Sequence, residues 1–432
     1  MRATCSVAAG LSIVAIVLGL FLLGLMFLYS RMETVQADYV FFCLVFMLLF
    51  YILPAVLISA EGSVVYAYRI YNFSQAEIQF ISGSMVVFLL GFFLTELLIS
   101  HRESVKRKSR SHRASVAPNT IRYMHSSVLV GTLGMLSTIL LYMLLIGYSS
   151  TVLEVRAGAI QGNYFISLML SGCLVTTVYC MAAMERSEWY YKLIPIVLIV
   201  GFSLQLGGRT TLLFSIAYAG ILFGLNLKKA VAMSLVLFPV MLPLIRDGKT
   251  LIYAIATGVP LGDFHFTLNF NYTDFANIYF DTIIINFAHP VISLITAPQL
   301  VESIGYRYFY DYIHGFLFYA RLVGIDAGDS LTYMNTEIIL GARRSTVPTG
   351  YVAFGYIQLS MIGIFVSGCF YRFLGYASLK FLKLGDKSSK VLRFHITLLC
   401  AYSFYTGEIR TMVVTVFFPI IVVKILQKLG RS

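Results

Sequence analysis

The chain has 432 residues, of which 59% are hydrophobic and only 12% are charged. Soluble globular proteins have about a quarter of their residues charged. The composition therefore excludes an ordinary soluble enzyme, and the high hydrophobicity excludes a disordered chain. The six cysteines form no CxxC pair and are sparse for a secreted disulfide scaffold. The net charge of +12 is explained by basic cytoplasmic loops of a membrane protein, with no nucleic acid needed as a partner.

Apolar segments close to the ~20 residues needed to cross a bilayer recur along the whole chain. We therefore expect an all-α, polytopic integral membrane protein with about 11 transmembrane helices. The expected spans are 7–29, 39–60, 79–100, 126–148, 164–184, 193–208, 210–227, 230–245, 350–371, 391–407 and 411–427. Gly207, Gly208 and Arg209 all disfavour the interior of a membrane helix. As an alternative to two spans, residues 193–227 therefore form one hairpin that turns at these three residues.

Positive charges set the expected orientation of these spans. The loop 101–125 carries seven Lys or Arg residues against the single acid Glu103, so we place this loop in the cytoplasm and the N-terminus outside. The chain then divides into three regions. These are N-terminal transmembrane helices at 1–245 (about eight spans), a large periplasmic loop at 246–349, and C-terminal transmembrane helices at 350–432 (about three spans).

Arginine is strongly favoured over lysine on the outer side of this topology. The outer cations are ten Arg and one Lys, whereas the inner ones are 11 Lys and ten Arg. A guanidinium group makes paired hydrogen bonds to phosphate or carboxylate, which the single ammonium of lysine does less well. The excess of arginine indicates an anion site, unless translocated loops simply avoid Lys and these arginines pair with nearby acids.

Charged residues at the ends of spans are candidates for function because they are costly in a membrane. Arg209 follows two glycines, Arg410 shares with Glu408 a three-residue gap between spans, and Arg156 lies in a short outer loop. The three arginines come from different segments on one side, and either an anion-binding cradle or a charge-stabilised structural contact explains them. Glu96 lies four residues from the cytoplasmic end of its span, and snorkelling of its side chain explains it.

The 246–349 segment is the one region large enough to form a substructure outside the bilayer. Its 104 residues hold nine acids, six cations, nine Tyr and nine Phe. The apolar stretches 251–260 and 282–297 are short for full spans, and we expect re-entrant or amphipathic helices there. The four tyrosines within 306–312 suit a sugar-binding surface and an interfacial aromatic belt equally well.

The motifs of common catalytic and metal sites are missing from the sequence. It contains no HExxH, no GxSxG, no Walker A loop and no CxxC with metal spacing. Asp326 and Asp329 are three residues apart, but in a Gly-containing loop this spacing is more typical of a turn than of a cation site. We therefore expect neither a metal ion nor another cofactor.

Three short segments of the C-terminal half are distinctive: Thr336-Glu337-Ile338-Ile339, the glycine-rich run from Gly350 to Gly363, and Gly407-Glu408-Ile409-Arg410. They occur together with an outward N-terminus, a basic loop after the third span and one long outer loop. In this order of parts the chain resembles the Wzy-type polysaccharide repeat-unit polymerases, the family of O-antigen and enterobacterial common antigen polymerases. The likeness in layout covers nearly the whole chain.

The resemblance implies a glycosyltransferase that joins undecaprenyl-pyrophosphate-linked oligosaccharide repeat units into a surface polysaccharide of the O-antigen type. The reaction would take place at the periplasmic face of the bacterial inner membrane, without nucleotide sugars. Donor and acceptor would both be lipid-linked glycans among membrane lipids, and a chain-length regulator protein is left open as a further partner.

The resemblance also implies roles for particular residues. The residues expected to take the proton from the acceptor hydroxyl are Glu337, Glu408, Asp281 and His289. Those expected to bind the pyrophosphate are Arg156, Arg209, Arg410, Arg343 and Arg344. The two glutamates match the family pattern best. The Arg343–Arg344 pair departs from that pattern, and it either binds donor phosphate or anchors the loop at the headgroups.

Two other functions remain open at this point. An O-antigen ligase has the same architecture and the same kind of lipid-linked donor, but it transfers the finished glycan to the lipid A core. A lipid-linked oligosaccharide flippase or a secondary transporter would show more even spans, short loops on both sides and inverted repeats. The long outer loop and the lack of a visible repeat argue against a transporter.

Overall fold

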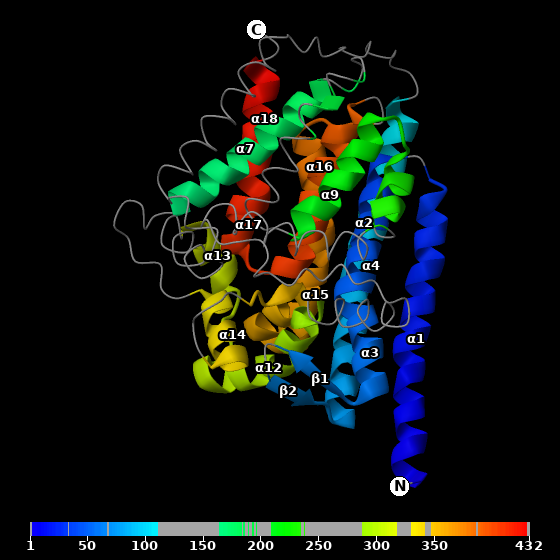
Figure 1. Ribbon diagram of the computed structural model, residues 1–432, viewed down its shortest axis with the longest axis vertical. Helices are drawn as coiled ribbons and strands as arrows, with labels where there is room; N and C mark the ends of the chain where they lie inside the picture. The colour runs from blue at the N-terminus through cyan, green and yellow to red at the C-terminus, as the bar shows by residue number, and fades with distance from the viewer. Residues whose placement is uncertain are drawn as a thin grey trace, which may run out of the picture. The chain divides into compact units, whose positions relative to one another are not determined.

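The protein is described here by a computed structural model (Figure 1). The described residues are 2–32, 34–66, 69–110, 164–183, 185, 189, 192–193, 196, 209–234, 237, 287–317, 330–341, 347–385 and 388–429. Nearly all of them are helical, and one short β-hairpin is the exception among them. The chain forms two compact units. The first comprises 1–119, 281–386 and 396–416, and the second 120–280, 387–395 and 417–432.

The first unit holds most of the described elements. They are α1 (Arg2–Ser30), α2 (Val35–Met47), the π-helical segment η1 (Leu48–Ile52), α3 (Leu53–Glu61), β1 (Ser63–Tyr66), β2 (Arg69–Asn72), α4 (Gln75–Arg110), α12 (His289–Ile304), α13 (Tyr310–Leu317), α14 (Leu331–Leu340), α15 (Gly350–Phe381), most of α16 (Lys390–Thr406), α17 (Ile409–Met412) and the start of the π-helical segment η6 (Val413–Phe417). The second unit holds α7 (Tyr164–Ala183), α9 (Arg209–Leu222), the start of α16 and α18 (Phe418–Leu429).

Several of these helices are long and apolar enough to cross a membrane. Within the described residues they are Val35–Ser59, Gln75–Arg102, Gly350–Phe381 and Ile409–Lys428. Each falls on an expected span, and α1, α7, α9 and α16 overlap four more. The protein is thus an all-α membrane protein, as the sequence predicts. The expected span 126–148 and most of the expected spans 193–208 and 230–245 lie outside the described residues, as do residues 251–286 of the expected outer loop. The total of eleven spans and the extent of the outer loop therefore stay predictions.

The core of the first unit is the contact between α4 and α15. Added Cβ atoms on Gly91 and Gly368 would overlap the backbone carbonyls of Phe365 and Phe88, respectively, so the two helices touch through their backbones. Small residues permit this close approach in membrane helices, where association depends on packing. The Cys369 thiol lies 3.3 Å from the Gly91 carbonyl oxygen at the same contact.

The helix α15 is broken, which the sequence did not predict for the expected span 350–371. Leu359 (φ −162°, ψ 51°) and Ser360 (φ 52°, ψ −139°) leave the helical conformation. The ring of Tyr351 lies 5.1 Å from that of Tyr371, and the backbones of Gly355 and Gly363 are in contact. Residues 350–358 therefore fold back along 361–381 as a tight helical hairpin.

A buried ion pair corrects the expectation for Glu96. Arg372 has no exposed surface, and its guanidinium donates to the Glu96 carboxylate and, over 3.1 Å, to Oε1 of Gln36. The ring of Tyr39 lies beside the same guanidinium, 5.4 Å from its Cζ to the ring centroid. A buried charge requires such a partner, because an unpaired one is costly to desolvate. Glu96 is therefore explained by its ion pair with Arg372 rather than by snorkelling.

The second unit shows how α16 begins. The Glu185 carboxylate accepts hydrogen bonds from the Ser389 hydroxyl (2.7 Å) and the Lys390 backbone N–H (3.0 Å). An acid at this position satisfies free N–H groups of the first turn and complements the helix dipole. Farther along, Nδ1 of His395 is hydrogen-bonded to the hydroxyl of Tyr218 in α9. These contacts fix the start of α16 on its neighbours.

Candidate functional site

Two glycines bring the ends of three helices together in the first unit. Gly407 follows α16 and Gly350 starts α15, and both have φ of +70°, a conformation that favours glycine. A Cβ on Gly407 would overlap the backbone of Gly350, and a Cβ on Gly350 would lie 2.9 Å from Cβ of Pro290 in α12. The turn after α16 is therefore pressed against the beginnings of α15 and α12.

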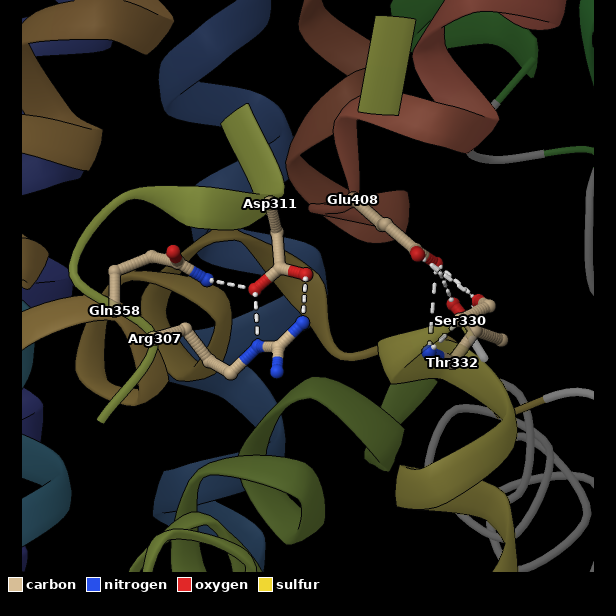
Figure 2. A network of polar contacts seen from close by, with 6 residues as sticks. All are labelled: Arg307, Asp311, Ser330, Thr332, Gln358 and Glu408. Atoms are coloured by element: carbon tan, nitrogen blue, oxygen red, sulfur yellow. Dashed lines mark hydrogen bonds and ion pairs between the residues drawn. The ribbon is translucent and has the colours of Figure 1, made fainter. Parts of the chain in front are cut away.

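Glu408, the residue after this turn, places a carboxylate in a cradle of hydroxyl groups. Its side chain points toward Ser330 and Thr332 at the start of α14 (Figure 2). The Ser330 hydroxyl lies 2.9 Å from Oε1 and 2.7 Å from Oε2. The Thr332 hydroxyl donates to Oε2 over 2.5 Å, and the Thr332 N–H lies 3.4 Å from the same atom. Glu408 is only 4% exposed, so these contacts hold a buried carboxylate in place.

The cradle has a structural role. Ser330 caps α14, because its hydroxyl oxygen accepts the Thr332 N–H over 3.1 Å, and the Glu408 carboxylate lies at the same helix end. An anion there complements the free N–H groups and the dipole of the helix. Among the described residues Oε1 receives one donor, Ser330, whereas a carboxylate oxygen has two lone pairs. Glu408 thus joins α14 to the turn after α16 and keeps capacity to accept a further hydrogen bond.

Side chains of α14 hold this helix against the segment that precedes α15. The amide of Asn335 donates to the Val347 carbonyl over 2.9 Å and to the Ser293 hydroxyl over 3.0 Å. The hydroxyl of Thr336 accepts the Val347 N–H over 2.7 Å and donates to the Thr332 carbonyl over 2.6 Å. The three sequence segments that carry the family resemblance, which start at Thr336, Gly350 and Gly407, therefore meet in one place.

The two expected glutamates differ in their surroundings. Glu337 follows the buried Thr336 in α14 but is itself exposed, since successive residues of a helix point about 100° apart. Its backbone carbonyl accepts the Gly341 N–H over 2.7 Å at the end of the helix. Glu408, by contrast, is buried in the cradle. Of the two, Glu408 lies in the better-defined polar site.

His289 opens α12 near the same helix ends and is 2% exposed. Its Nε2 lies 3.4 Å from the Tyr405 carbonyl oxygen, and its ring packs edge-on against the Tyr405 ring with centroids 4.0 Å apart. Burial lowers the pKa of His289 to about 3, because the charged imidazolium would be desolvated. The ring is therefore neutral at pH 7 and a weak base, and its expected part in proton transfer stays a prediction.

Among the described residues, Arg410 is the expected pyrophosphate ligand nearest to Glu408 in the chain. It is two residues from Glu408 and 8% exposed, so it is buried rather than placed in the outer water. Arg209 starts α9 in the second unit. The remaining expected residues, Arg156, Arg343, Arg344 and Asp281, lie outside the described residues. The proposed grouping of Arg156, Arg209 and Arg410 is therefore untested.

A second polar group was missed by the sequence reasoning. Asp311 accepts two hydrogen bonds from Arg307, from Nε over 3.1 Å and from a terminal nitrogen over 3.2 Å, and one from the Gln358 amide over 2.8 Å. Figure 2 shows Asp311 with both partners, and Glu408 on a neighbouring helix. The N–H groups of Arg307 and Tyr308 also donate to the carbonyls of Ile357 and Gln358 (3.0 and 2.9 Å), which the break in α15 frees from helical bonding.

Only some of the contacts around Asp311 and Glu408 had a signal in the sequence. Arg307 and Asp311 are four residues apart, the spacing of an ion pair on one helix face. Ser330 before an apolar run is typical of a helix cap. Gln358 is 47 residues from its partner Asp311, and Glu408 is 78 residues from its partner Ser330. No local pattern in the sequence could indicate either pairing.

Within the part of the chain that the structure describes, no group of three or more His, Cys, Asp or Glu could hold a metal ion. Comparisons with protein-family models, with curated proteins and with solved structures give no match for this chain. The resemblance to repeat-unit polymerases therefore rests on the sequence segments described above.

Proposed function

We propose that the protein is a polysaccharide repeat-unit polymerase. It joins undecaprenyl-pyrophosphate-linked oligosaccharides by glycosyl transfer at the periplasmic face of the bacterial inner membrane. The observation that carries the proposal is the buried Glu408 carboxylate in its hydroxyl cradle, with Arg410 two residues away, at the beginning of a membrane-length helix. The fold as a membrane protein and the meeting of the three resembling segments support it further.

In the proposed reaction, the acceptor hydroxyl forms a bond to the anomeric carbon of the donor glycan. The bond from that carbon to the pyrophosphate oxygen breaks, and the hydroxyl proton passes to Glu408. A carboxylate within hydrogen-bonding distance of the acceptor hydroxyl suits this proton transfer. The leaving pyrophosphate gains negative charge, and Arg410 with other outer arginines stabilises it through paired N–H donors.

Deletion of the gene tests this proposal in the cell. Repeat units would still be made and flipped, so we expect a lipid-anchored glycan that carries one repeat unit in place of the long polymer. Electrophoresis of the surface glycan and mass spectrometry of the lipid-linked pool measure this. Unattached full-length polymer would indicate a ligase instead, and repeat units trapped on the cytoplasmic side would indicate a flippase.

A further inference from the structure

The short helix α13 presents an apolar stripe on its outer face. Tyr310, Ile313 and Phe316 are spaced three residues apart and are 43%, 68% and 52% exposed. Tyr308, in the turn before the helix, is 71% exposed. Residues at this spacing share one side of a helix. Three large apolar or aromatic side chains therefore lie on one exposed side of α13, and the exposed Tyr308 precedes them.

The opposite face of α13 is polar or small and has its partners within the chain. The Asp311 carboxylate is paired with the Arg307 guanidinium and accepts a hydrogen bond from the Gln358 amide. The Tyr312 hydroxyl is hydrogen-bonded to the Ser367 hydroxyl over 2.8 Å. The Asp311 carboxylate and the Tyr312 hydroxyl thus have protein partners, which suits a medium of low polarity.

Two membrane-length helices contact this inner face. The Tyr312 ring packs against Phe370 in the 361–381 half of α15, with centroids 5.3 Å apart. A Cβ on Gly315 would lie 2.7 Å from Cβ of Ile409, the first residue of the membrane-length helix Ile409–Lys428. The 361–381 half of α15 also exposes apolar side chains, such as Ile362 at 62% and Phe373 at 51%. The stripe on α13 thus lies beside the first residue of one membrane-length helix and on a helix packed against another that exposes apolar side chains.

We propose that α13 lies along the membrane surface, with Tyr308, Tyr310, Ile313 and Phe316 in the boundary between lipid headgroups and acyl chains. Amphipathic helices bind at this boundary through their apolar face, and tyrosine is enriched there. The side chains of the stripe are uncharged, and the Arg307 guanidinium lies over the Tyr310 ring, 4.5 Å from its Cζ to the ring centroid. Gly315 packs against the Ile409 side chain and the Arg410 backbone N–H, so α13 lies directly beside the segment that carries Arg410.

The inference is independent of the proposed enzymatic function, and the single tryptophan of the chain makes it testable. In a Trp189→Phe background, Ile313→Trp places a reporter in the stripe, Phe316→Trp provides a second one, and Ser303→Trp on the exposed surface of α12 is the control. All three positions lie outside the core, so the substitutions do not disturb packing. The proteins are reconstituted in phosphatidylcholine vesicles with or without brominated acyl chains.

We expect brominated lipid to quench the fluorescence of Ile313→Trp and Phe316→Trp several-fold more strongly than that of Ser303→Trp. Aqueous acrylamide should quench in the reverse order. Strong acrylamide quenching of both stripe reporters, with no effect of brominated lipid, would overturn the inference and make the stripe a contact surface for protein or glycan in water.

Discussion

Glu408→Gln is expected to abolish polymer formation while the protein remains folded. The amide keeps the size and an accepting oxygen toward Ser330 and Thr332, but it cannot take up a proton. Loss of a general base slows a reaction by roughly 100-fold to 10,000-fold. The glycan ladder should shrink to single repeat units at matched protein level in the membrane, as measured by electrophoresis and immunoblotting.

A matched variant separates this chemical role from the structural one. Thr332→Val removes the hydroxyl that donates to Glu408 over 2.5 Å but leaves the carboxylate. Loss of a hydrogen bond to a charged group costs about 1.5–3 kcal/mol, so this variant should unfold at a lower temperature and still make long polymer. If Glu408→Gln instead keeps the full ladder and only unfolds earlier, Glu408 is a helix-capping residue and not the base.

Arg410→Lys is the second change with a large expected effect. Lysine keeps the charge but loses the guanidinium fork that makes paired hydrogen bonds to pyrophosphate. Loss of one charge-assisted bond of about 1.5–3 kcal/mol in the transition state slows the step roughly tenfold to a hundredfold. Shorter glycan ladders at equal expression would show this.

Because Arg410 is buried, its replacement can also change the stability of the protein. The same experiment therefore includes a stability measurement. The thermal unfolding of the purified variant should remain within a few degrees of the parent protein. Arg2→Lys and Arg69→Lys, on the same expected side but outside the site, are controls that should leave the ladders unchanged. Full-length ladders from Arg410→Lys would assign Arg410 to packing or topology.

Hydropathy predicted the helices of this protein well, because apolar length alone decides which segments suit a bilayer. The membrane-length helices Val35–Ser59 and Gln75–Arg102 contain expected spans almost unchanged. The break at Leu359 and Ser360 had no such signal, since residues 350–371 are uncharged throughout. It depends on contacts from elsewhere in the chain, above all the N–H groups of Arg307 and Tyr308 that bond to the freed carbonyls.

In the candidate site, too, the sequence indicated residues with a local signal but not their distant partners. Glu408 and Arg410 were recognisable because charged residues between two apolar spans are unusual. The hydroxyl donors of Glu408 lie 76 and 78 residues away in the chain, and the partner of Glu96 is 276 residues away. Only the folded chain brings these groups together, so the sequence alone leaves the partner of each buried charge undetermined.

Reconstitution tests the central claim, that this protein makes glycosidic bonds between lipid-linked repeat units. The purified full-length protein is placed in lipid vesicles with undecaprenyl-pyrophosphate-linked repeat units from a deletion strain as the only substrate, and products are separated by size. We expect lipid-linked glycans of two, three and more repeat units, with one undecaprenyl pyrophosphate released for each new bond, and no extension with Glu408→Gln. Substrate that stays one repeat unit long with active parent protein, including substrate that is only moved across the bilayer, would contradict the account.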